Sequence, residues 1–260
     1  MQEDREKKIK AGGDYLNAGR FDRAIELFSS VLDTTPADDE VLNYLGLAWD
    51  GQGDYERAIY YFDQALGNNP NHSQAYLNRG NAWANKGEAE RAIADYSTAL
   101  QKSPDDESAF CHRGQCHASN GDYEKAIVDY DKALALNPKR EETYFNRGFA
   151  SLKTGDYHSA IKDFTETIDL NPRESDAYLN RGISKIKLGD LDGAIADFTS
   201  AKDINPNLAF AYYNRSIGFY QKGLFQEALT DAYRSLDLDP LDRRYQMLAD
   251  SLELRIEKST

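Results

Sequence analysis

Small and apolar residues recur along this chain at a fixed interval of 34 residues. One position of the interval carries alanine in every copy: Ala24, Ala58, Ala92, Ala126, Ala160, Ala194 and Ala228. An aromatic ring follows four residues later in all copies but the last: Phe28, Phe62, Tyr96, Tyr130, Phe164 and Phe198. Small residues at fixed helical positions let two helices approach closely, and a facing ring fills the space between them. The pattern therefore predicts closely packed helices that repeat.

Proline and glycine divide each interval into two parts. All seven prolines are 34 residues apart: Pro36, Pro70, Pro104, Pro138, Pro172, Pro206 and Pro240. Because proline interrupts helices, each should lie in the loop before a new helix. A glycine halfway between them marks a turn: Gly19, Gly53, Gly87, Gly121, Gly155, Gly189 and Gly223. A unit of this length has room for two helices of about 13 residues.

We number each repeat so that its proline occupies position 32. The two helices of the first repeat are then expected over residues 6–18 and 22–34, and both recur every 34 residues. Leu248, Leu252 and Ile256 form one apolar stripe after the last repeat, as expected of a helix that caps a stack. The expected boundaries are a tail at 1–4, seven repeats at 5–38, 39–72, 73–106, 107–140, 141–174, 175–208 and 209–242, and a capping helix with the C-terminal tail at 243–260.

A glycine at position 8 completes the pattern, and Ser216 replaces it in the last repeat: Gly12, Gly46, Gly80, Gly114, Gly148 and Gly182. With the alanine at position 20 and the aromatic residue at position 24, the sequence resembles the tetratricopeptide repeat (TPR) family over residues 5–242. The resemblance implies an all-α fold, a right-handed superhelical α-solenoid of seven helix-turn-helix repeats plus a C-terminal capping helix. It also implies a concave groove, lined by the first helix of each repeat, in which ligands bind.

Position 6 of the first helix lies in the arc that lines this groove in TPR proteins. From the third repeat onward it carries Asn78, His112, Asn146, Asn180 and Asn214. This row resembles the asparagine ladder in the TPR region of O-linked N-acetylglucosamine transferases, where side-chain amides bond the backbone of an extended peptide. An amide offers both a donor and an acceptor, which matches a peptide group. The alternative is that these amides are solvated or bond to adjacent helices.

Large apolar residues are expected beside this row in repeats 5 to 7. The set comprises Phe145, Phe149, Leu179, Ile183, Tyr213, Ile217 and Tyr220. So many apolar side chains on a groove exceed the usual scatter on a surface and favour contact with a peptide's side chains. The alternative is that the curvature of the array buries some of them against one another.

A matched pair of charges predicts an ion pair inside the later repeats. Position 7 is arginine in repeats 3 to 7: Arg79, Arg113, Arg147, Arg181 and Arg215. Position 23 is aspartate in the same repeats: Asp95, Asp129, Asp163, Asp197 and Asp231. Repeats 1 and 2 lack both residues, so the two are expected to contact each other within a repeat. We therefore interpret these arginines as structural.

Net charge narrows the class of partner. The chain has 31 Lys and Arg against 44 Asp and Glu, a formal charge of −13. A nucleic-acid binder needs clustered positive charge, so this balance argues against nucleic acid and against anionic membranes. It suits a protein or peptide partner with basic residues. The N-terminus lacks the apolar core of a signal peptide, and no apolar run is long enough to span a bilayer, which makes the cytoplasm the expected location.

The two cysteines and the histidines do not form a metal or cofactor motif. Cys111 and Cys116 are five apart on one expected helix, too distant for a disulfide, which fits a reducing compartment. The segment between them lacks the spacing of a haem attachment motif and has no further zinc ligands nearby. No set of residues assembles a catalytic site. The sequence thus favours a non-enzymatic scaffold or adaptor without a cofactor. The recognition arm of a larger enzyme, such as a glycosyltransferase, and a self-associating structural protein are the alternatives.

Overall fold

The computed structural model describes residues 2–258, and every regular element within them is an α-helix. The helices are α1 (Gln2–Asn17), α2 (Phe21–Leu32), α3 (Asp39–Gly51), α4 (Tyr55–Asn68), α5 (Ser73–Asn85), α6 (Ala89–Lys102), α7 (Glu107–Ser119), α8 (Tyr123–Leu136), α9 (Glu141–Thr154), α10 (Tyr157–Leu170), α11 (Ser175–Leu188), α12 (Leu191–Ile204), α13 (Ala209–Gln221), α14 (Phe225–Leu238) and α15 (Arg243–Glu257). Their ends lie within two residues of the expected ones, except that α1 begins at Gln2 and includes residues 2–4 of the expected tail.

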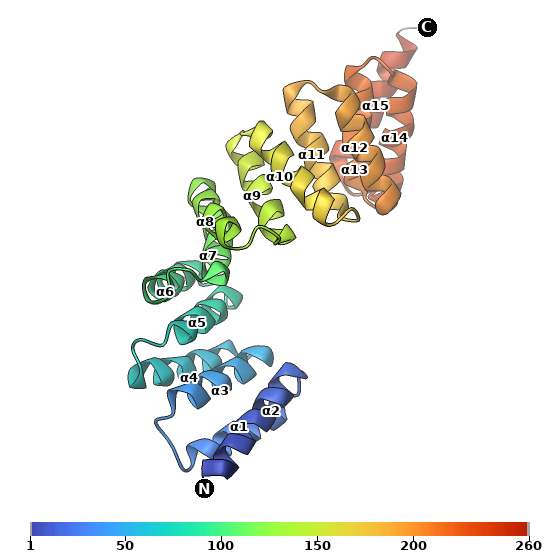
Figure 1. The fold of residues 1–260 in the computed structure, drawn as a ribbon. Helices are drawn as coiled ribbons and strands as arrows, with labels where there is room; N and C mark the ends of the chain where they lie inside the picture. Colours follow the sequence, from blue (N-terminus) through green and yellow to red (C-terminus); the bar gives the residue numbers. More distant parts are fainter. Residues whose placement is uncertain (1, 259–260) are drawn as a thin grey trace. The chain divides into compact units, whose positions relative to one another are not determined.

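The chain forms two compact units, Met1–Asn137 and Pro138–Thr260. The first unit contains α1 to α8 and the second α9 to α15. Inside each unit every helix packs against the next one along the chain, and the two helices of each repeat lie side by side (Figure 1). Each unit is therefore an all-α stack of helix-turn-helix repeats, as the sequence predicted.

Helix ends are set by capping side chains and by the turn glycines. Asp38 accepts a hydrogen bond from the backbone N–H of Val41 at the start of α3, and Asp54 accepts one from Arg57 at the start of α4. Such caps satisfy amide groups that have no partner inside the helix. The turn glycines adopt positive φ angles, 68° at Gly19 and 86° at Gly87, which other residues rarely adopt. These local devices place one helix pair in every interval.

The glycine at position 8 packs against the aromatic ring at position 24. In α11 a Cβ atom on Gly182 would lie 2.6 Å from a ring carbon of Phe198 in α12, so only glycine fits there. Phe198 and Ala194 are both fully buried. The last repeat uses another solution, because Ala232 replaces the ring and the hydroxyl of Ser216 donates to the carbonyl oxygen of Ala228. The predicted helix contact is thereby confirmed.

Helix α15 covers the last repeat, but by a wider stripe than the sequence indicated. Leu252 is fully buried, whereas Leu248 and Ile256 are only partly buried. Tyr245 and Ala249 are buried as well. They stand where repeats carry positions 3 and 7, so α15 packs like the first helix of an eighth repeat.

Candidate peptide-binding surface

Two of the three position-6 asparagines of the second unit are held by their own helices. The side-chain amide of Asn180 donates to the carbonyl oxygen of Asp176 at 2.8 Å, and that of Asn214 donates to Phe210 at 2.7 Å. Asn146 is half-buried, and its side-chain amide makes no hydrogen bond within the part of the chain that the structure describes. Each amide therefore keeps its carbonyl oxygen and at least one N–H for another partner.

The two members of the row in the first unit are used differently. Asn78 is 5% exposed, and its amide donates to the side-chain oxygen of Asn43 at 2.9 Å while its own oxygen accepts from Gln74 at 3.1 Å. Asn78 is thus bonded to Asn43 on α3 and to Gln74 on its own helix, which leaves it fewer hydrogen-bonding groups for a peptide than the asparagines of the second unit. His112 is half-buried, with its ring 5.9 Å from that of Tyr96. It lines a cavity described below.

The predicted apolar contacts divide into core and surface residues. Leu179 is 6% exposed and belongs to the core around Phe198, so it offers little surface to a ligand. Phe145 packs edge-on against Phe164 with ring centroids 5.7 Å apart. Phe149, Ile183, Tyr213 and Ile217 are partly buried, and Tyr220 is 42% exposed. Position 5 therefore turns toward the core more than the sequence indicated, because the helix pairs pack too closely to leave it open.

The capping helix extends this apolar set, which was not expected from the sequence. Met247 and Leu254 on α15 are 70% and 56% exposed, and with Tyr220 they line a pocket of about 480 Å³. Tyr213 contacts α15 through Tyr245, whose ring centroid is 5.1 Å away. Met247 and Leu254 stand 34 residues after Tyr213 and Tyr220, so extending the repeat numbering past residue 242 would have found them.

We call the surface that these residues share the asparagine face. It comprises Asn146, Phe149, Asn180, Ile183, Asn214, Ile217 and Tyr220 on α9, α11 and α13, with Met247 and Leu254 on α15. Its polar groups can bond a peptide backbone and its apolar groups can contact side chains.

The five arginines form the predicted ion pairs within their repeats. In each, Nε and Nη2 donate to the two carboxylate oxygens of the aspartate at 2.7–3.0 Å. In the last repeat the Asp231 side chain is 5% exposed and that of Arg215 is 15% exposed. The arginines therefore have a structural role, as expected.

These arginines also connect neighbouring repeats, which was not predicted from the sequence. The Nη1 atom of Arg113 donates to the hydroxyl of Ser97 at 3.0 Å, and that of Arg215 donates to Thr199 at 2.9 Å. Arg181 does the same to Thr165 at 3.1 Å. The acceptor lies 16 residues before each arginine. A serine, threonine or aspartate at that position in the sequence could have indicated this contact.

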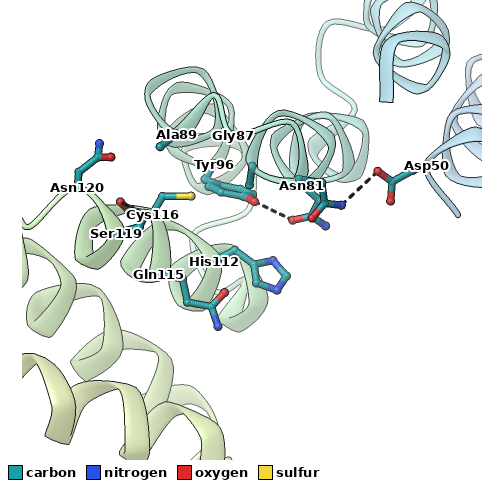
Figure 2. Close-up of a pocket in the computed structure, with 12 residues that line it drawn as sticks. Asp50, Asn81, Gly87, Ala89, Tyr96, His112, Gln115, Cys116, Ser119 and Asn120 are labelled. Atoms are coloured by element: carbon teal, nitrogen blue, oxygen red, sulfur yellow. Dashed lines mark hydrogen bonds between the residues drawn. The ribbon is translucent and has the colours of Figure 1, made fainter. Parts of the chain in front are cut away.

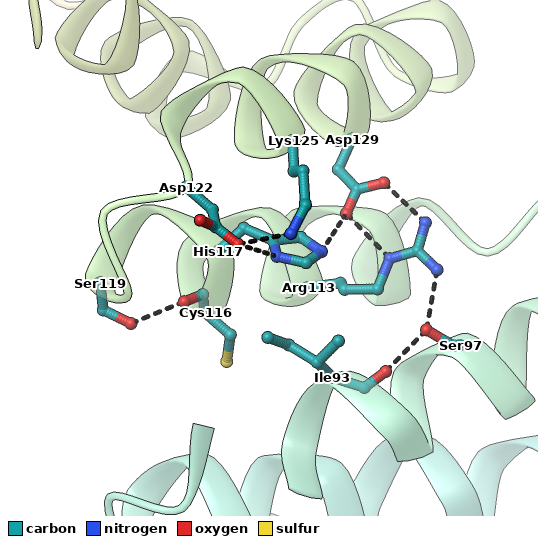
Figure 3. Close-up of polar contacts among 9 residues, drawn as sticks. All are labelled: Ile93, Ser97, Arg113, Cys116, His117, Ser119, Asp122, Lys125 and Asp129. Atoms are coloured by element: carbon teal, nitrogen blue, oxygen red, sulfur yellow. Dashed lines mark hydrogen bonds and ion pairs between the residues drawn. The ribbon is translucent and has the colours of Figure 1, made fainter. Parts of the chain in front are cut away.

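Position 11 carries a nitrogen-bearing side chain beside two of the ion pairs, a histidine in repeat 4 and a lysine in repeat 6. In repeat 4 the ring of His117 lies between Asp122 and Asp129, with ring nitrogens 4.0 Å and 3.9 Å from their oxygens (Figure 3). Burial lowers the pKa of His117, and the nearby Asp129 opposes this effect. In repeat 6 the Lys185 ammonium is 2.8 Å from Asp197. Both side chains are part of the repeat packing.

A cavity of about 770 Å³ opens on the first unit (Figure 2). Its wall comes from the groove-lining arcs of α3, α5 and α7, together with the hydroxyl end of Tyr96 and the turn before α6. The lining residues are mostly small or uncharged polar: Asn81, Ala84, Asn85, Gly87, Ala89, Gln115, Cys116, Ser119 and Asn120, with Asp50, Tyr96 and His112. The sequence predicted the ligand chiefly on repeats 5 to 7, and of the residues that line this cavity only His112 was among the predicted contacts.

The described residues show no metal cluster and no membrane-spanning helix, and their two thiols are buried. Over residues 2–258 no cluster of three potential metal-ligating side chains occurs, and no helix is long and apolar enough to cross a membrane. Cys111 and Cys116 are both buried in the first unit and are not joined in a disulfide. Burial raises the pKa of the Cys116 thiol to about 11, which disfavours its reactive thiolate form.

Sequence profiles of the tetratricopeptide repeat family match this chain. The matched segments are 9–73, 50–107, 108–140, 129–162 and 146–209, which together run without a gap from residue 9 to residue 209. The chain belongs to the tetratricopeptide repeat family. No protein of curated function matches the sequence.

Solved structures of TPR proteins share the fold. A TPR protein from Cytophaga hutchinsonii, solved for its C-terminal part, superposes with a TM-score of 0.75 at 16% identity over 92% of this chain and 98% of that one. YrrB, a TPR protein with an unusual peptide-binding site, superposes with a TM-score of 0.66 at 23% identity over 72% of this chain and 96% of its own. MamA superposes with a TM-score of 0.61 at 25% identity over 62% and 94%. The family and these structures define a protein-interaction scaffold.

Proposed function

We propose that this protein is a non-enzymatic adaptor that binds an extended peptide segment of a partner on the asparagine face. The observation that carries the proposal is that two of the three side-chain amides in the row are held in place by hydrogen bonds to their own helices. Asn180 and Asn214 are each fixed by a bond to their own helix, so their remaining groups are oriented before a ligand arrives. Groups that are ordered in advance cost less conformational entropy on binding.

Apolar and acidic groups beside the amides define what the peptide should carry. Phe149, Ile183, Ile217 and Tyr220 offer partly exposed apolar surface for its side chains. Asp176 is exposed at the start of α11 and favours a basic residue in the ligand. A similar fold in YrrB, which has a peptide-binding site, makes a peptide the expected ligand class. Two buried cysteines that are not joined in a disulfide support a reducing compartment, and we propose the cytoplasm.

Peptides that the chain itself selects provide the ligands for the test. They are taken from a displayed random library with the full chain and titrated against wild type, Asn146→Ala/Asn180→Ala/Asn214→Ala and Phe149→Ala. Since one hydrogen bond contributes about 0.5–1.5 kcal/mol, the triple variant should weaken every selected peptide. Phe149→Ala could cost about 2 kcal/mol for peptides that place a side chain there.

Asn207→Ala is the matched control, because Asn207 is exposed in a loop of the same unit. It should bind like wild type. If the triple variant and Phe149→Ala keep wild-type helicity and wild-type affinity, the asparagine face is not the site. A molecular mass that rises with concentration would then favour the self-associating alternative, and a catalytic partner that co-purifies would favour the recognition arm of an enzyme.

A further inference from the structure

We propose that the cavity of the first unit is a second binding site, which accepts the cationic side chain of an arginine or lysine from a bound peptide. It lies on α3, α5 and α7, none of which contributes to the asparagine face. The inference therefore does not depend on the function proposed for the second unit.

The acidic residue in the cavity wall favours a cationic ligand group. Asp50 is the single acidic residue of the wall, and neither lysine nor arginine lines it. Asp50 takes part in no ion pair within the described part of the chain, and its carboxylate accepts one side-chain hydrogen bond, a long one of 3.4 Å from Asn85. Burial raises the pKa of Asp50, as expected for a carboxylate whose charge is poorly compensated. A cation from a ligand would supply that compensation.

Three other aspartates of the same unit contrast with Asp50, because each contacts an arginine. Asp95 and Asp129 are the more deeply buried carboxylates, and each is bonded twice by an arginine of its repeat. Asp63, at the surface, also contacts Arg79 at 2.5 Å. The fold thus supplies a guanidinium to each of these carboxylates but none to Asp50. A partly buried charge that has no cationic partner and lies in a cavity is a frequent mark of a binding site.

Neutral groups around Asp50 add acceptors and space. The hydroxyl of Tyr96 donates to the side-chain oxygen of Asn81 at 2.8 Å, which leaves the lone pairs of the hydroxyl as acceptors (Figure 2). A guanidinium or ammonium group carries several N–H donors and no acceptor, so it matches a carboxylate beside a hydroxyl oxygen. Ala84 stands at position 12, where repeats 5 and 6 carry Leu152 and Ile186, and its small side chain keeps the cavity open.

The experiment is an NMR titration of the full ¹⁵N-labelled chain with blocked pentapeptides that differ at the central residue. The central residues are arginine, lysine and citrulline, the neutral analogue of arginine. The reporters are the side-chain amide of Asn81 and the backbone amides of Gly87 and Ala89. The arginine and lysine peptides should shift these signals saturably. The citrulline peptide should bind about tenfold more weakly or worse, because it cannot compensate the carboxylate.

Two variants and one control locate the effect. Asp50→Asn, which keeps the shape and removes the charge, should weaken the arginine peptide by about tenfold or more. Ala84→Leu should abolish binding by filling the cavity while Asp50 remains. Asp105→Asn makes the same charge change at an exposed loop position of this unit and should bind like wild type. Equal affinity for arginine and citrulline, undiminished binding by Asp50→Asn, or reporters that no peptide shifts would each overturn the proposal. None of these readouts concerns the asparagine face, so the two sites fail or succeed separately.

Discussion

At the residue scale, the arginine of each arginine–aspartate pair stabilises the packing of several helices. Arg215 bonds both oxygens of Asp231 inside its repeat and the hydroxyl of Thr199 in the repeat before it. A single guanidinium therefore joins three helices, α12, α13 and α14. The aspartate depends on it, because a buried carboxylate without a cation carries a large desolvation cost.

We therefore predict that Arg215→Leu destabilises the protein by about 3–5 kcal/mol, since it leaves Asp231 buried and uncompensated. The double variant Arg215→Leu/Asp231→Leu should recover much of this loss, because it removes the orphaned charge as well. Urea unfolding of both single variants, the double variant and wild type measures the coupling. Additive effects of the two single changes would show that the pair does not act as a unit.

The glycine at position 8 gives a second residue-scale prediction. Gly182→Ala brings a Cβ atom to 2.6 Å from Phe198, and the resulting strain should cost about 1–3 kcal/mol. Gly67→Ala is the control, because a Cβ atom at this helical glycine of α4 would meet no atom within 4 Å. The control should be stabilising by about 0.5–1 kcal/mol, since alanine loses less entropy in a helix. Thermal unfolding followed by circular dichroism compares the two variants, and a Gly182→Ala protein as stable as Gly67→Ala would contradict the packing argument.

At the scale of the helix, position 11 shows how one repeat can differ from the others without losing its fold. Four repeats place an aromatic residue there: Tyr15, Trp49, Trp83 and Phe219. Repeat 4 places His117 instead, whose ring also faces Arg113 and Lys125 in addition to the two aspartates. The ring keeps the packing shape of an aromatic residue and adds a group that titrates near neutral pH.

We expect His117 to make stability depend on pH. Its folded pKa is lowered, so below the ordinary value of about 6.5 the unfolded chain binds a proton more readily than the folded one. This contribution to stability is present above that pH and is lost as the pH falls through it. His117→Phe should therefore lose less stability than wild type between about pH 7.5 and about pH 5.5. Urea midpoints at both pH values test this, and an equal loss in the two proteins would assign the dependence to other groups.

At the scale of the whole molecule, the chain carries more acidic than basic residues. The formal charge is −13 on 260 residues. Such a charge raises the rate at which a basic ligand meets the surface, whichever site it then occupies. The two proposed sites lie on different units, and each proposal pairs a basic group of the ligand with an acid, Asp50 in the first unit and Asp176 in the second.

A basic peptide selected by the full chain should accordingly associate more slowly as salt screens the charge. Between about 50 mM and about 500 mM NaCl we expect its association rate to fall several-fold, while its dissociation rate changes less. The same peptide with its basic residues replaced by glutamine is the control and should show little dependence on salt. Stopped-flow fluorescence measures both rates. A salt effect confined to dissociation would point to a short-range ion pair without steering.

The sequence predicted side-chain contacts best where a residue has the same partner in several repeats. The glycine and ring at positions 8 and 24, and the arginine and aspartate at positions 7 and 23, each lie 16 residues apart in the same repeat. Because every repeat folds into the same helix pair, residues that are replaced together reveal the contact. The helices, the repeat register and the capping helix followed from the same periodicity.

The sequence alone therefore determined the repeats, their helices and the ion pairs, since these are local interactions copied along the chain. Only the tertiary structure decided which polar groups remain for a ligand. Asn78 and Asn214 share position 6, yet the first is buried in a bond with Asn43, and the second bonds its own helix and keeps its oxygen available. That difference depends on the neighbouring repeat, because Asn43 supplies an acceptor that no residue supplies to Asn214. The cavity at Asp50 arises likewise from small residues on two neighbouring helices, α5 and α7, and no single repeat contains it.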